Sequence, residues 1–64
     1  MIGKYELQND QRFIVGVTSF EMLQGDCIEV TQVDPLSKEV LVDFGGNLID
    51  WKHRRILEKL KKIN

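Results

Sequence analysis

Short runs of alternating apolar and polar residues limit the fold of this chain more than any other feature. The clearest runs span residues 12–18, 27–33 and 38–44, and shorter ones span 3–7 and 47–49. Side chains at every second position of a strand point to the same side of a sheet. A period of two, with many β-branched and aromatic residues, therefore predicts a strand at each run.

Turn-forming residues separate these runs at short intervals. Gln-Asn-Asp-Gln at 8–11, Gln-Gly-Asp at 24–26 and the segment 34–37 around the single proline each break the alternation. Gly45 and Gly46 permit the positive backbone angles of a tight hairpin turn, and Gly16 inside the first run predicts a bulge. Four to five short antiparallel strands joined in this way predict a small β-barrel over residues 1–50.

The small size of the chain limits what such a barrel can do. A chain of 64 residues forms one domain, here residues 1–64, with little room for a deep active site. No apolar run approaches the roughly 20 residues that span a bilayer, and no charged and apolar leader follows Met1. Cys27 is the only cysteine, so no internal disulfide can form. We expect a cytoplasmic protein in which Cys27 is a small apolar residue of a strand.

Acidic and basic residues are segregated along the chain. Residues 1–50 carry three Lys and Arg against nine Asp and Glu, whereas residues 51–64 carry six against one. The formal net charge of -1 therefore conceals an acidic body and a basic tail.

The basic tail has the pattern of an amphipathic helix over residues 51–63. Asp50 is a suitable N-cap, and good helix formers follow it. Ile56, Leu60 and Ile63 recur at helical spacing and predict one apolar stripe. The opposite face carries six cations, namely Lys52, Arg54, Arg55, Lys59, Lys61 and Lys62.

One segment resembles a known class of fold. An apolar residue, a turn, Gly-Asp and an alternating strand follow one another in residues 19–30, which read SFEMLQGDCIEV. This order resembles the diverging-turn segment of SH3-like barrels, and the similarity extends over roughly residues 12–50. It implies a mainly β, SH3-like barrel with an added C-terminal α-helix. Small bacterial SH3-like modules that contact nucleic acid look nearer than the peptide-binding kind, which uses a groove of clustered aromatics.

Catalysis has little support in the sequence. His53 is the only histidine, and nothing places it beside Cys27 or a serine as an activated nucleophile. One cysteine and one histidine do not supply the spacing of a zinc site, and the acidic residues are too scattered for a calcium loop. We expect a protein that is not an enzyme and that has no metal or other cofactor.

Two functions remain open. The six cations of the tail predict a binding or regulatory module that associates with nucleic acid, although a solvated polar face explains them as well. The alternative is a protein-interaction or inhibitory module of phage or mobile-element type, which uses an acidic barrel surface formed by Asp26, Glu29, Asp34, Glu39 and Asp43.

Trp51 also has two interpretations. It either closes the open end of the barrel beside Phe44 or stays exposed as a partner contact. The expected partners are nucleic acid or a protein and not a membrane, and the expected state is a monomer or a weak homodimer.

Overall fold

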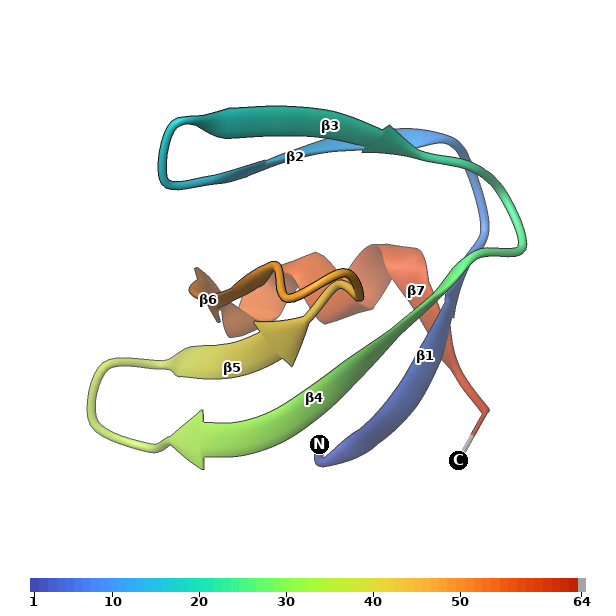
Figure 1. Cartoon of the computed structure of the whole chain (residues 1–64). Coiled ribbons are helices and arrows are strands. Elements are labelled where there is room, and N and C mark those ends of the chain that lie inside the picture. The colour runs from blue at the N-terminus through green and yellow to red at the C-terminus, as the bar shows by residue number, and fades with distance from the viewer. Residues whose placement is uncertain (64) are drawn as a thin grey trace.

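The computed structural model describes residues 1–63 and is mainly β. Its strands form a five-stranded antiparallel sheet in the order β6-β5-β4-β1-β7 and a separate hairpin of β2 and β3. The sheet curls beneath the hairpin (Figure 1), but the two do not join into the closed barrel that the sequence predicted. The elements are β1 (Gly3–Leu7), β2 (Gln11–Val15), β3 (Thr18–Met22), β4 (Cys27–Asp34), β5 (Glu39–Asp43), β6 (Ile49–His53), the 3-10 helix η1 (Arg54–Lys59) and β7 (Leu60–Lys62).

The core lies between the concave face of the sheet and the hairpin. The alternation predicted in the sequence places Val30, Val40 and Val42 on this inner face, where each is fully buried. Leu7 in β1 is also buried, with 1% of its surface exposed. Directly opposite residues share one face of a sheet, so the register Val30↔Val42 and Val40↔Lys52 continues the inner face from β4 into β6.

Three phenylalanines join the hairpin to the sheet. Phe13 of β2 and Phe20 of β3 are cross-strand partners, and both rings pack on Phe44 at the end of β5. The ring centroids of Phe13 and Phe44 are 4.8 Å apart, and those of Phe20 and Phe44 are 5.5 Å apart. Aromatic pairs at these separations stabilise a fold beyond the area that they bury. This cluster therefore fixes the hairpin over the sheet.

The strand predicted over residues 12–18 ends at Val15, earlier than its alternation indicated. Gly16 has a φ of 60° and lies in the turn between β2 and β3, so it is a hairpin glycine rather than a bulge. Val17 consequently leaves the apolar face and is fully exposed. The predicted turn at 24–26 is confirmed, and Asp26 Oδ2 accepts a hydrogen bond from Leu23 N at 2.8 Å.

The connection between β5 and β6 uses three consecutive residues with positive φ. Gly45, Gly46 and Asn47 have φ values of 91°, 59° and 65°, and Phe44 N donates to Leu48 O at 2.8 Å. These residues occupy the turn, so the last strand of the predicted barrel begins at Ile49 and not at Asn47. It then continues to His53, four residues past its predicted end.

The predicted C-terminal helix over residues 51–63 is wrong. Residues 51–53 extend β6, η1 is a six-residue 3-10 helix, and β7 pairs with β1 through Leu7↔Leu60. A short helix gains little stability without packing. Pairing of β6 with β5 and of β7 with β1 instead satisfies backbone groups on both sides of the sheet. Asp50 is not an N-cap, because it pairs with Val42 inside the sheet. No helix in residues 1–63 has the length and apolar character needed to cross a membrane.

The buried side chain of Leu7 gives a test of this core. We expect Leu7→Ala to lower the free energy of unfolding by about 2 to 5 kcal/mol, because it removes methyl groups from a site that is almost completely buried. The matched control is Val17→Ala at the exposed hairpin tip, which should change stability by less than about 0.5 kcal/mol. Urea denaturation followed by circular dichroism measures both. Equal losses for the two variants would contradict the described core.

Candidate functional site

The six cations assigned to one helix face lie on three different elements. Lys52 belongs to β6, η1 carries Arg54, Arg55 and Lys59, and β7 carries the other two, Lys61 and Lys62. The structure therefore divides the predicted basic face, and each group has different neighbours.

The two arginines of η1 line a hollow of about 470 Å³ at one end of the molecule. Arg54 and Arg55 border it together with Lys38 from the turn between β4 and β5. Tyr5 and Leu57 contribute apolar surface to its wall, and one carboxylate, Glu58, is also present. Three cations and one anion give this hollow a positive balance.

A second hollow, of about 330 Å³, continues the basic surface along η1 toward β2. Arg55 lines both hollows, and Lys59 and Arg12 join it in the second. Arg12 Nη1 also donates to Ser19 Oγ across the hairpin at 3.2 Å. We call the combined surface the basic end; its cations are Arg12, Lys38, Arg54, Arg55 and Lys59.

Backbone contacts fix the start of η1 against the turn that carries Lys38. His53 is the N-cap of η1, and its Nδ1 accepts from Arg55 N at 3.1 Å. Arg54 N donates to Lys38 O at 2.8 Å. Two cations separated by 16 positions in the sequence therefore lie together because their backbones are bonded.

The turn around Lys38 is itself well ordered by Asp34. The Asp34 carboxylate accepts from Leu36 N at 3.0 Å and from Ser37 N at 3.4 Å. The bond from Leu36 N, with those from Ser37, lowers the pKa of Asp34. Lys38 follows with a φ of 61°, a left-handed conformation that favours glycine. A lysine in this position keeps a cation at the hollow.

Few of the cations are neutralised by the protein itself. Within residues 1–63 one ion pair lies under 4 Å, that between Lys52 Nζ and Asp50 Oδ2 at 3.4 Å. Lys52 Nζ also donates to Ile14 O of the hairpin. Lys52 thus links β6 to β2, while in the same part of the chain Arg54 and Arg55 have no carboxylate within ion-pair distance.

The two cations of β7 are set apart from the basic end. Lys61 is the cross-strand partner of Glu6, and Lys62 is the partner of Tyr5. Neither lines the two hollows. Burial raises the pKa of the Tyr5 hydroxyl, which donates to Met1 O at 2.7 Å.

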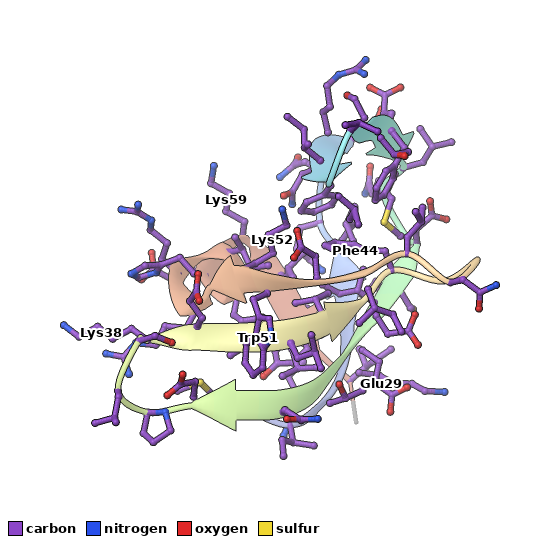
Figure 2. The ribbon with its side chains drawn as sticks, turned by 60° about the vertical axis from the view of Figure 1, so that its left-hand side comes forward. Glu29, Lys38, Phe44, Trp51, Lys52 and Lys59 are labelled. Atoms are coloured by element: carbon purple, nitrogen blue, oxygen red, sulfur yellow. The ribbon has the colours of Figure 1, made fainter. Side chains whose placement is uncertain are left out.

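Trp51 does not close the open end of a barrel. It lies opposite Leu41 on the outer face of the sheet and is 38% exposed, whereas Phe44 packs inside with the hairpin phenylalanines. Figure 2 shows the Trp51 side chain across β5 and Lys52 and Lys59 pointing toward the opposite side. Trp51 therefore belongs to a different surface from the basic end.

The outer face of the sheet also carries several of the predicted acidic residues. Glu29 and Asp43 are direct cross-strand neighbours, and Glu39 lies two residues before Leu41 on the same side of β5. Asp26 is an exception, because it caps the turn before β4. Cys27 begins strand β4 as expected, and its side chain is exposed. Within residues 1–63 no three His, Cys, Asp or Glu side chains are placed to hold a metal ion.

Sequence reasoning missed two members of the basic end, Arg12 and Lys38. Each is an isolated cation in an acidic stretch, and neither shares a local pattern with η1. Only the tertiary structure brings them to Arg55 and Arg54. Of the two, Lys38 had a local signal, since it directly follows the turn segment with the single proline.

The bonds of Lys52 predict a structural role that separates it from its basic neighbours. We expect Lys52→Met, which keeps the length of the side chain, to lower the free energy of unfolding by about 1 kcal/mol, because the charged link from β6 to the hairpin is lost. Amide hydrogen exchange should accelerate in β2 and β3. Arg54→Gln is the control, and it should leave hairpin exchange unchanged because Arg54 contacts the 35–38 turn.

The candidate site has two surfaces. One is the basic end, built from β2, the 35–38 turn and η1, and the other is the outer sheet face that carries Trp51. β6 contributes to both surfaces, since Ile49 and Trp51 lie on the outer face and His53 lines the larger hollow. No family model, curated protein or solved structure matches the chain.

Proposed function

We propose that this chain is a small non-enzymatic binding module that associates with nucleic acid through its basic end. We assign its fold to an SH3-like arrangement with an incompletely closed barrel. Three features support that assignment: the sheet order β6-β5-β4-β1-β7, the hairpin inserted between β1 and β4, and the 3-10 helix between the last two strands. A fold of this kind serves many functions, so the functional proposal rests on the site.

The observation that carries the proposal is the convergence of cations on one hollow. Lys38, Arg54 and Arg55 come from two separate segments and border the same space; among residues 1–63 they have no ion-pair partner, and Glu58 is the single carboxylate of the lining. Cations gathered without neutralising partners repel one another, and an anion on this surface relieves that repulsion. A ligand with several negative charges satisfies such a surface best.

A phosphate backbone matches both the chemistry and the shape of the basic end. Each guanidinium presents several donors in a planar fork that suits phosphate oxygens. The two hollows share Arg55 and the carboxylate Glu58. Five cations against this one carboxylate let consecutive phosphates of one strand follow the surface from Lys38 to Lys59. Contacts of this kind position a nucleic acid without reading its bases. We therefore expect binding that depends weakly on base sequence and strongly on salt.

Neutralising the two arginines tests this proposal. The variant Arg54→Gln with Arg55→Gln should lose most of its affinity for labelled oligonucleotides at low salt. For single-stranded DNA the slope of log affinity against log salt should become shallower by about 1.4, because two phosphate contacts disappear. Fluorescence anisotropy with single-stranded and double-stranded DNA and RNA, at low and moderate salt, measures both quantities.

The matched control removes the same charge from another part of the surface. Lys4→Gln with Lys61→Gln neutralises two cations that lie opposite Glu29 and Glu6 and outside the basic end. This variant should bind within about twofold of the unchanged chain, since screening limits the reach of surface charge. Equal losses in the two variants, or no binding by the unchanged chain at low salt, would refute a nucleic-acid site at η1.

A substitution of Lys38 tests oligonucleotide binding and folding stability separately. Lys38→Gly removes a cation from the hollow and also replaces a residue with left-handed φ by the residue that best tolerates it. We expect weaker oligonucleotide binding with unchanged or slightly higher stability, measured by anisotropy and thermal melting. Asn47→Gly is the control, because Asn47 has a similar φ of 65° in a turn that does not line either hollow.

A further inference from the structure

The outer face of the sheet carries an exposed apolar strip that nothing in residues 1–63 covers. Trp51 and Ile49 of β6 are 38% and 49% exposed, and Leu41 of β5 lies directly opposite Trp51. The three side chains share one face because opposite and second-neighbour residues of a sheet point to the same side. In Figure 2 the Trp51 side chain extends over β5 on this face.

Carboxylates flank the strip on two sides. Glu39 and Asp43 lie two residues on either side of Leu41 and therefore diagonal to Trp51. Glu29 of β4 is directly opposite Asp43. Like charges in direct cross-strand positions repel each other. Within the described residues, none of these three carboxylates has an ion-pair partner under 4 Å. Asp43 Oδ1 accepts from Gly45 N at 2.8 Å and Lys4 lies opposite Glu29, but the three carboxylates still leave net negative charge on two sides of the apolar strip.

We propose that this outer face binds a cationic segment of another protein, with an arginine side chain stacked on Trp51 and paired with Glu39 or Asp43. A guanidinium combines the two interactions that the face offers, because it stacks on an aromatic ring and donates to a carboxylate. A hollow of about 420 Å³ beside these carboxylates is lined by Glu29, Asp43 and one cation, Lys4, so its balance is negative by one charge. Ile49 and Leu41 contact the apolar residues between the cations.

The charge of the face argues against its other occupants. A nucleic acid that stacked a base on Trp51 would bring its phosphates against Glu39 and Asp43, which repel them. A symmetric dimer through this face would bring the carboxylates of two copies into one interface, since a two-fold interface joins identical patches. A basic protein segment meets neither obstacle. This inference is independent of the function proposed for the basic end.

Trp51 supplies a direct test, because it is the only tryptophan of the chain. The full chain is titrated with a synthetic peptide of about eight residues in which arginine and leucine alternate, and the Trp51 indole is followed by fluorescence and by its NMR resonance. We expect a saturable change, with backbone shifts confined to the outer positions of β4, β5 and β6. Trp51→Leu removes the aromatic ring but stays apolar, and it should weaken binding about two- to fivefold, as measured by the backbone shifts because the indole is then absent.

Charge-matched variants distinguish this face from general attraction. Glu39→Gln with Asp43→Asn should weaken peptide binding about three- to tenfold. Asp10→Asn with Glu21→Gln removes the same charge from positions outside this face, and it should change binding less than about twofold, since the asparagine side chain keeps an oxygen acceptor for Gln24 N. Equal losses in the two pairs, or peptide shifts centred on the basic end, would overturn the proposal.

The remaining outcomes identify a different occupant. Self-association seen by analytical ultracentrifugation without peptide, and abolished by Trp51→Leu, would assign the face to a second copy and refute the cationic partner. An oligonucleotide that shifts the Trp51 indole in competition with the peptide would assign it to nucleic acid and refute the proposal as well. Retention of the indole shift in Arg54→Gln with Arg55→Gln is expected, because the basic end takes no part.

Discussion

The antiparallel pairing of β5 with β6 determines the sides on which the later residues of the chain lie. Val40↔Lys52 and Val42↔Asp50 continue the inner face, and Leu41↔Trp51 continues the outer one. A shift of one residue in this register would exchange the two sets. The buried valines of β5 oppose such a shift, since it would move Val40 and Val42 from the core into water. The separation of Trp51 from Lys52 therefore follows from the core of the sheet.

The same pairing positions η1. Because β6 ends at His53 beside Glu39, the chain leaves the sheet next to the turn that carries Lys38. Arg54 N then bonds Lys38 O, and the His53 ring caps the first turn of the 3-10 helix. β7 returns the chain to β1 after six residues. A longer α-helix would carry the last residues away from β1 and leave its outer edge without a partner.

Local alternation predicted β2, β4 and β5, because there the period of two coincides with burial of Phe13, Val30 and Val42, but it predicted no separate strand at β3. The sequence pattern misled where the same residues fitted both a strand period and a helical period. Ile56, Leu60 and Ile63 fit a helical stripe, but Leu60 packs as a strand residue opposite Leu7. Helix propensity is worth only tenths of a kcal/mol per residue, and pairing with β1 outweighs it. Of the six predicted cations, Arg54, Arg55 and Lys59 line the two hollows, and their grouping with Arg12 and Lys38 depends on tertiary contacts that no local pattern contains.

The overall acidity of the chain does not argue against a phosphate-binding surface. The molecule measures 30 × 28 × 18 Å, whereas at physiological ionic strength charges are screened over about 8 Å. A phosphate beside Arg54 and Arg55 therefore interacts mainly with the cations around it, and carboxylates such as Glu29 on the outer sheet face contribute little. The same screening lets the outer face attract a cation while the basic end attracts an anion. Net charge describes neither surface, because each ligand responds to the charges within about one screening length.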